Sequence, residues 1–156
     1  MTYSNAGRPA RGFTMIELML VLTLIAVLLA LAVPAYRDYT VRAKITECIN
    51  GAAVAKLHIS EYRQTLGAWP SDVSAAGIDA PAGDSPYCSG YSDYQPATGA
   101  FAINIDAAAI NPGLGNVKPL MVPSTTASNI VNWDCRLGAT ADENVKYLPS
   151  TCRDNG

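Results

Sequence analysis

The feature that most constrains this chain is the run of apolar residues that follows Glu17. Residues 18–33 contain no charged side chain, and Thr23 is the one polar residue among them. A membrane-spanning helix needs roughly 20 mainly apolar residues, and a single helix satisfies its own backbone hydrogen bonds in lipid. We therefore expect residues 13–35 to form a membrane-spanning helix. A charged residue at a helix centre costs about 2.5–3.5 kcal/mol on insertion scales, so Glu17 needs a partner and is a candidate functional residue.

The residues just before Glu17 suggest what that partner is. Cleavage after Gly12 would create a new α-amino group on Phe13, one helical turn from Glu17. Glycine suits a cleavage position because its backbone is unhindered. The pattern indicates a membrane-stored subunit whose processing creates a positive charge for its own acid or a neighbour's. In the simpler alternative Glu17 only complements the helix dipole, which is worth at most about 1–2 kcal/mol and does not require an acid inside an apolar run.

The N-terminus also has a second targeting interpretation. Arg8 and Arg11 followed by an apolar run describe a secretory signal peptide as well. However, the run is long, has no distinct small-residue cleavage site after it, and ends at Pro34 before an amphipathic segment. We therefore favour a retained anchor. Basic residues stay on the cytoplasmic side, so the remainder of the chain faces the periplasm or the cell exterior.

Beyond Pro34, which we expect to bend the helix, the pattern becomes amphipathic. Apolar residues recur at spacings of three and four, which predicts one buried stripe of a long helix. Gly51 is a local weak point, because glycine costs about 1 kcal/mol in a helix. Gly67 and Pro70 end the helix, which makes a helix over residues 13–66 about 80 Å long. The stripe comprises Val41, Ile45, Cys48, Ala52, Ala55, Ile59, Tyr62 and Leu66.

The second half of the chain is typical of an antiparallel sheet. Residues 71–86 are rich in Ala, Gly, Ser, Asp and Pro and indicate a loop. Four strand candidates follow, with the alternation clearest at 101–106 and a turn at 111–116. The third candidate contains Pro119, which predicts an edge strand, and the fourth places Ile130 and Trp133 as core candidates. The candidates are residues 87–94, 101–106, 117–122 and 129–135.

Composition excludes several functions. Residues 36–156 carry nine Lys/Arg against twelve Asp/Glu, so general attraction to nucleic acid is not supported. His58 is the only histidine and there is no Cys-x-x-Cys, which argues against a metal site and a cofactor. We interpret His58 as a solvated helix residue and the acidic pair Asp142–Glu143 as a solvated loop. No catalytic constellation is present, so we do not expect an enzyme.

The four cysteines, in a domain expected to be exported, predict two disulfides. The residues alone allow three pairings of Cys48, Cys88, Cys135 and Cys152.

The sequence Gly12-Phe13-Thr14-Met15-Ile16-Glu17-Leu18, the apolar run, and then Pro34, Tyr36 and Tyr39 resemble the N-terminus of a type IV prepilin. The match resembles type IVa prepilins of the gammaproteobacterial major-pilin kind. It extends strongly to about residue 70, and moderately over residues 135–153. One departure is Ala26, where many pilins have a glycine eight residues before the proline.

The resemblance implies an α+β fold: a long N-terminal helix, transmembrane then amphipathic, packed on a roughly four-stranded antiparallel sheet with a disulfide-bounded C-terminal loop. It implies a leader over residues 1–12, an anchor over 13–35 and a globular domain over 36–156. Cleavage falls between Gly12 and Phe13, methylation on the Phe13 amine, and assembly depends on Glu17 and Pro34. The implied C-terminal bridge joins Cys135 to Cys152, which leaves Cys48 with Cys88; Cys48–Cys135 and Cys48–Cys152 are the alternatives.

The implied function is a structural subunit of a type IV pilus, used for adhesion, motility or DNA uptake. Its expected partners are other subunits, prepilin peptidase, the inner membrane before assembly and the pilus assembly machinery. Two alternatives stay open. A minor or competence pilin would bind DNA through a cluster of Arg37, Lys118, Arg136, Lys146 and Arg153 on one face, and a type II secretion pseudopilin is disfavoured by the paired C-terminal cysteines.

Overall fold

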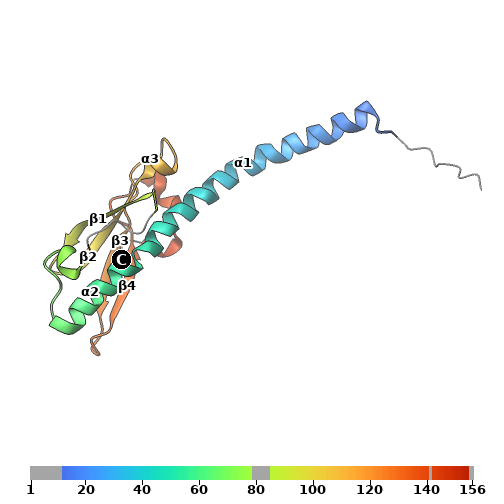
Figure 1. Cartoon of the computed structure of the whole chain (residues 1–156). Coiled ribbons are helices and arrows are strands. Elements are labelled where there is room, and N and C mark those ends of the chain that lie inside the picture. Colours follow the sequence, from blue (N-terminus) through green and yellow to red (C-terminus); the bar gives the residue numbers. More distant parts are fainter. Residues whose placement is uncertain (1–11, 79–84, 141, 155–156) are drawn as a thin grey trace, which may run out of the picture. The chain divides into compact units, whose positions relative to one another are not determined.

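The computed structural model describes residues 12–78, 85–140 and 142–154 (Figure 1). The expected leader, with Arg8 and Arg11, lies outside these residues apart from Gly12, and so does the middle of the 71–86 loop. The chain divides into two compact units, Met1–Arg37 and Asp38–Gly156.

One long helical segment runs from the first unit into the second. Helix α1 covers Met15–Gly51 and α2 covers Ala53–Leu66. Only Ala52 separates them, and the backbone bonds Ala52 N–H to Cys48 O (3.2 Å) and Lys56 N–H to Ala52 O (3.0 Å) cross the junction. The irregularity lies beside Gly51, where the sequence predicts a weak point. Gly67 ends α2 in the left-handed conformation at φ 72°, with its N–H bonded to Arg63 O.

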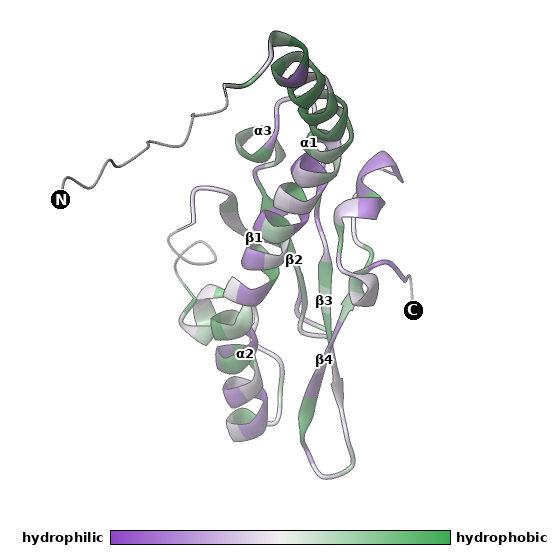
Figure 2. Ribbon diagram, turned by 90° about the vertical axis from the view of Figure 1, so that its right-hand side faces the viewer, coloured by the Kyte–Doolittle hydropathy of each residue, from purple (hydrophilic) through white to green (hydrophobic). Residues whose placement is uncertain are grey.

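The predicted stripe forms the helical side of the core in the second unit. Val41, Ile45, Cys48, Ala52, Ala55 and Ile59 are all at most 5% exposed. The stripe ends sooner than expected, because Tyr62 is only partly buried and Leu66 is 63% exposed. Figure 2 shows how the composition changes along the helix: the start of α1 is almost uniformly apolar, whereas α2 mixes polar and apolar residues.

The sheet is an antiparallel meander in the order β1-β2-β3-β4. Phe101, Ile103 and Ile105 of β2 lie on its inner face as predicted, at 0%, 0% and 7% exposed. Ala102 between them is buried too, at 3% exposed. The four-stranded α+β prediction is thereby confirmed. The strands are β1 (Cys88–Gln95), β2 (Ala100–Ile105), β3 (Leu120–Thr125) and β4 (Val131–Arg136).

The prediction that the third strand is an edge strand is wrong, because β3 lies between β2 and β4. Pro119 precedes the strand, and its carbonyl accepts the Ile103 N–H at 2.9 Å. Pro123 lies inside β3, but beyond Met121 the strand pairs only with β4. Both prolines therefore avoid a position where two neighbouring strands require an N–H.

Trp133 and Ile130, the two core candidates of the β3–β4 hairpin, differ in burial. Trp133 packs edge-on against Phe101, with ring centroids 5.5 Å apart, and its Nε1 donates to Ser60 Oγ at 2.9 Å. Ile130 is 55% exposed, so its core assignment is wrong. Thr126 holds Ile130 in the turn by a two-way contact, in which Thr126 N–H donates to Ile130 O (3.0 Å) and Thr126 Oγ1 accepts the Ile130 N–H (3.2 Å).

Short helical turns complete the fold. They are η1 (Ser74–Ala76) after α2, α3 (Ala107–Ile110) after β2, and η2 (Asp142–Tyr147) and η3 (Ser150–Cys152) at the C-terminus. Asp106 caps α3 by accepting the Ala109 N–H at 3.1 Å. Leu148 and Cys152 are buried and fasten the C-terminal turns to the core.

Candidate functional site

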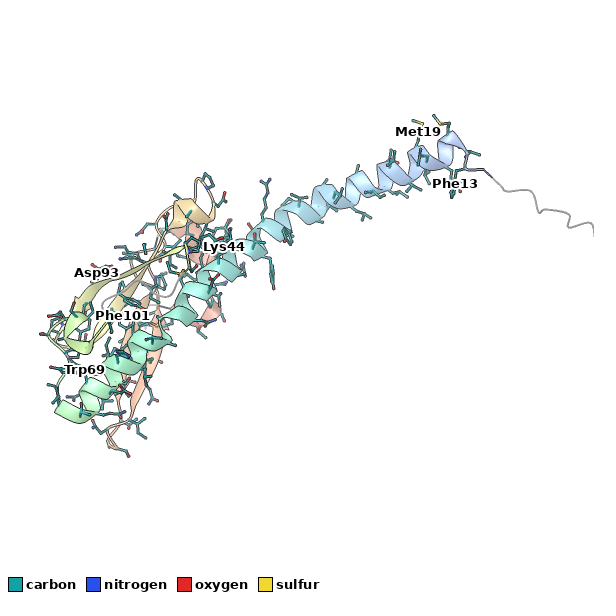
Figure 3. The ribbon with its side chains drawn as sticks, viewed as in Figure 1. Phe13, Met19, Lys44, Trp69, Asp93 and Phe101 are labelled. Atoms are coloured by element: carbon teal, nitrogen blue, oxygen red, sulfur yellow. A yellow bond between two sulfur atoms is a disulfide. The ribbon has the colours of Figure 1, made fainter. Side chains whose placement is uncertain are left out.

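The N-terminal end of α1 brings the predicted processing residues close to Glu17. Gly12, Phe13 and Thr14 precede the helix, and Phe13 is 85% exposed (Figure 3). Thr14 is the N-cap: its carbonyl accepts the Leu18 N–H and its Oγ1 accepts the Glu17 N–H, both at 3.2 Å. Glu17 thus lies in the first turn, on the same end of the helix as the Phe13 backbone nitrogen.

The role of Thr14 was missed from the sequence, although a signal for it exists. Thr14-x-x-Glu17 before an apolar run is the pattern of a capping box, in which the residue at the N-cap satisfies an otherwise unpaired N–H of the first turn. In an apolar surrounding such an N–H costs about 1–3 kcal/mol when it has no partner. Thr14 therefore fixes where the helix begins and holds the backbone of Glu17 in the first turn.

The first unit exposes its apolar residues. The large side chains between Leu18 and Val33 are 45–74% exposed, and none of the most apolar stretch of the helix is buried. By length and composition this helix is able to cross a membrane. A contiguous apolar surface of this size needs a cover, either lipid or protein.

Pro34 lies inside α1, which continues as helix on both sides of it. Between Glu17 and Pro34 the helix rises about 25 Å at 1.5 Å per residue. The structure therefore does not bring these two predicted assembly residues together. The bend that we expect at Pro34, where one helical hydrogen bond is missing, stays a prediction.

The first disulfide joins the helix to the sheet. Cys48 in α1 and Cys88 at the start of β1 are bonded with their Cα atoms 5.4 Å apart. Cys48 is fully buried and Cys88 is 5% exposed, so this bridge is part of the core. Next to it, the Lys44 Nζ lies 4.5 Å from the centroid of the Tyr87 ring.

The second disulfide, Cys135–Cys152, closes the C-terminal loop with a Cα separation of 4.6 Å. Both bridges are the pairs that the resemblance implies. Three further contacts hold the loop. Leu137 N–H donates to Asp154 O (2.9 Å), Lys118 N–H donates to Thr140 Oγ1 (3.0 Å), and Asn116 Nδ2 donates to Ala139 O. The loop is thereby tied to the segment that leads into β3.

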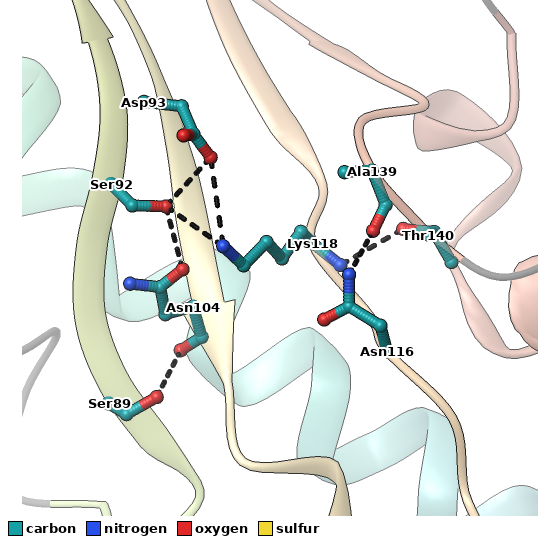
Figure 4. A network of polar contacts seen from close by, with 8 residues as sticks. All are labelled: Ser89, Ser92, Asp93, Asn104, Asn116, Lys118, Ala139 and Thr140. Atoms are coloured by element: carbon teal, nitrogen blue, oxygen red, sulfur yellow. Dashed lines mark hydrogen bonds and ion pairs between the residues drawn. The ribbon is translucent and has the colours of Figure 1, made fainter.

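A polar network covers the outer side of β1 and β2 (Figure 4). The Lys118 ammonium reaches Ser92 Oγ at 3.4 Å and Asp93 Oδ2 at 3.7 Å, and Ser92 Oγ donates to Asn104 Oδ1 at 2.7 Å. Arg153 donates to Leu148 O (3.0 Å) and Lys146 O (3.2 Å). The Lys146 Nζ lies 4.8 Å from the centroid of the Tyr147 ring. Lys118, Lys146 and Arg153 of the DNA-binding alternative are therefore engaged in local contacts.

The tyrosines that follow the loop pack against the core. Tyr91 meets Phe101 edge-on at 5.2 Å between centroids, and burial raises the pKa of its hydroxyl. Tyr94 donates from its hydroxyl to Pro70 O at 2.9 Å. Burial, and then the charge of Asp72 and the nearby Tyr62, raise the pKa of Tyr94 to about 12. The Tyr94 bond holds the segment after α2 onto the sheet, and the Tyr91 ring joins β1 to β2.

The interpretation of His58 as a purely solvated residue is wrong. His58 is half-buried, and its Nδ1 donates to Ala76 O at 3.1 Å, which holds η1 against α2. Among the described residues there is no group of three or more His, Cys, Asp or Glu side chains able to hold a metal ion.

Two family models match the chain. The pilin model, for a bacterial filament protein, matches residues 41–153, and the model of the prokaryotic N-terminal methylation motif matches residues 7–33. The second match includes Gly12, Phe13 and Glu17.

Similar proteins extend over nearly the whole chain. The fimbrial protein EcpC of Eikenella corrodens is 35% identical over 144 residues, which are 92% of this chain and 91% of that protein. The type IV major pilin protein PilE of Neisseria gonorrhoeae is 33% identical over 162 residues, covering 93% and 95% of the two chains. A crystal structure of a Pseudomonas aeruginosa type IV pilin has a TM-score of 0.49 and 18% identity, covering 73% of this chain and 98% of that one. On the evidence of the family models and the full-length relatives, the chain belongs to the pilin family of bacterial filament proteins.

Proposed function

We propose that this pilin is made as a membrane-anchored precursor, cleaved between Gly12 and Phe13, methylated on the Phe13 amine and assembled into a filament through its N-terminal helix. Membership of the family makes the chain a structural subunit that polymerises with other pilins after processing by prepilin peptidase. The positions of the leader (1–12), of the anchor (13–35) and of the globular domain (36–156) are part of the proposal.

The observation that carries this proposal is the exposed, acid-bearing apolar helix. A helix with large side chains that are 45–74% exposed is covered by lipid before assembly and by other copies of itself after it. In either surrounding Glu17 needs an opposite charge, and cleavage creates one on the Phe13 amine. We propose that Glu17 pairs with the Phe13 amine of an adjacent subunit, with Thr14 fixing the turn that carries it.

The same proposal places the second unit on the far side of the membrane. Arg8 and Arg11 stay in the cytoplasm, and residues 36–156 fold in the periplasm before the pilus assembly machinery extracts the subunit. Two disulfides suit a compartment in which thiols are oxidised.

The cleavage position is tested by a substitution that blocks it. Replacing Gly12 with Leu puts a bulky side chain next to the scissile bond, and we expect a full-length precursor that stays in the inner membrane. Intact mass spectrometry of membrane and filament fractions measures this. A mature chain that begins at Phe13 in the Gly12→Leu variant would contradict the assignment.

A further inference from the structure

The helix presents a second exposed face in the unit Asp38–Gly156, opposite the stripe that packs on the sheet. At about 100° per residue, Tyr39, Val54 and Leu57 lie within about 60° of each other on this face. They are 71%, 62% and 57% exposed. Scattered apolar residues need no explanation, but here three large ones share one face of a helix whose apolar N-terminal half is already an assembly surface.

Charged residues border this face on both sides. Glu61 and Glu47, the acidic rim, lie about 40° and 80° to one side of Tyr39 and Leu57, on either side of Val54. Arg42 and Lys56, the basic rim, lie about 60° and 100° to the other side. Arg42, Glu47 and Glu61 are exposed, and Lys56 is half-buried. Within the described part of the chain none of these four side chains makes an ion pair, since the ion pair found there is Lys118–Asp93.

The helix itself offers these charges little compensation. Intrahelical ion pairs form between residues three or four positions apart, and Glu61 and Lys56 have no opposite charge at those positions. Arg42 has Asp38, but Asp38 Oδ1 accepts the Tyr147 hydroxyl at 3.3 Å. Glu47 has Lys44, but the Lys44 ammonium lies over the Tyr87 ring. Each rim is therefore available to a partner of opposite charge.

We propose that the face formed by Tyr39, Val54 and Leu57 with its two rims is a contact with a second copy of this chain in the filament. The acidic rim of one copy meets the basic rim of the next, and Val54 and Leu57 are buried between them. An acidic and a basic rim on opposite sides of one face fit a heterologous contact between parallel copies, which repeats without closing and generates a helical filament. The contact adds to the assembly through the N-terminal helix that we propose, so the inference rests on the proposed function.

The occupant is thus a copy of the chain itself and not a membrane surface. An anionic lipid surface would attract Arg42 and Lys56 but repel Glu47 and Glu61. In a filament of copies, one neighbour satisfies the acidic rim and the next neighbour satisfies the basic rim.

Charge reversal in the full-length chain tests this contact. We expect Glu47→Lys with Glu61→Lys, or Arg42→Glu with Lys56→Glu, to lower the yield of sheared filaments by about tenfold or more, because like charges then meet across the contact. Combining all four substitutions exchanges the rims and should restore most of the yield. The control pair Asp142→Lys with Glu143→Lys changes the net charge as much as the first variant, on exposed residues of η2, and should leave the yield unchanged.

The apolar centre is tested by Val54→Ser with Leu57→Ser, compared with Ile130→Ser, an equally exposed apolar residue at the hairpin. The first should lower filament yield several-fold and the second should not. Processed, disulfide-bonded subunit in the membrane fraction should be at the wild-type level in every variant. The contact would be overturned if the variant with all four charge substitutions gave no more filaments than the two double variants. It would also be overturned if either double variant assembled normally. Neither result argues against assembly through Glu17, because every variant retains that residue. The proposed function would instead be contradicted if the unmodified chain formed no filaments.

Discussion

The Glu17 N–H donates to the Thr14 hydroxyl oxygen at 3.2 Å, so the residue that follows the proposed new N-terminus, Phe13, sets the first turn of α1. Removing this oxygen without changing the shape of the side chain isolates its contribution. We expect Thr14→Val to cost about 0.5–2 kcal/mol at the helix N-terminus.

We expect the Thr14→Val variant to form fewer filaments, because the first turn of the helix frays and no longer holds Glu17 in place. Counting sheared filaments per amount of processed subunit measures the effect. Thr14→Ser keeps the hydroxyl and should restore assembly; a Ser variant as defective as Val would show that the cap is not the cause.

The Trp69 ring and Gly99 form a close contact that the sheet requires. A Cβ on Gly99 would lie 2.5 Å from Trp69 Cε3, and the φ of +76° is already unfavourable for other residues. Gly99→Ala should lower the free energy of unfolding by about 2–4 kcal/mol. Gly113→Ala has the same left-handed backbone and no atom within 4 Å, so it should cost only about 1 kcal/mol.

Urea unfolding of the detergent-solubilised chain, followed by tryptophan fluorescence, measures both glycine variants. Equal losses of unfolding free energy in the two variants would mean that the Trp69 ring moves aside without cost. Backbone strain alone would then explain both losses.

The two disulfides are expected to differ in their contribution to stability. With sequence separations of 40 and 17, the loop-entropy model assigns about 4 kcal/mol to Cys48–Cys88 and about 3 kcal/mol to Cys135–Cys152. Paired Cys→Ser substitutions should therefore lower the stability of the fold more at Cys48–Cys88, where they also place polar groups in the core. Thermal unfolding compares the two variants, and a larger loss at the C-terminal bridge would contradict this order.

Tyr94 predicts an alkaline limit of stability. Its pKa is raised to about 12 in the folded chain from an ordinary value near 10, so the neutral hydroxyl is favoured by folding. This contribution is complete below pH 10 and is lost as the pH rises from 10 to 12. Tyr94→Phe should lower stability at neutral pH by about 1 kcal/mol, because the bond to Pro70 O is lost.

The same substitution should flatten the fall in stability above pH 10. Unfolding at a series of pH values checks this, and an unchanged alkaline slope in Tyr94→Phe would assign the slope to other groups.

Much of this fold follows from periodicity, and the errors have physical reasons. The stripe from Val41 to Ile59 and the alternation in β2 depend on local spacing alone, so the sequence predicts them well. The position of β3 depends on which strands flank it, and two prolines placed beside the shared ladder carry no such information. Ile130 looks like a core residue until the hairpin turn, set by Thr126, is known.

The site divides in the same way. The pattern of Gly12, Phe13, Glu17 and the apolar run is local, so the sequence alone indicates it, and the roles of these residues stay predictions. The cap at Thr14 is likewise indicated by its spacing to Glu17. The contact of His58 with Ala76 was not predictable, because it joins residues 18 positions apart through a loop without periodicity. The rims on the outer helical face become visible only when the sheet shows which face is covered.

The measurement that tests the central claim most directly is filament assembly by a Glu17→Gln variant. Glutamine keeps the size of the side chain and its hydrogen bonding but removes the charge that we pair with the Phe13 amine of a neighbour. The account predicts a subunit that is anchored and processed at least as well as the unmodified chain, with sheared filaments reduced about tenfold or more. Filaments at the normal level, built from Glu17→Gln subunits that begin at Phe13, would contradict it.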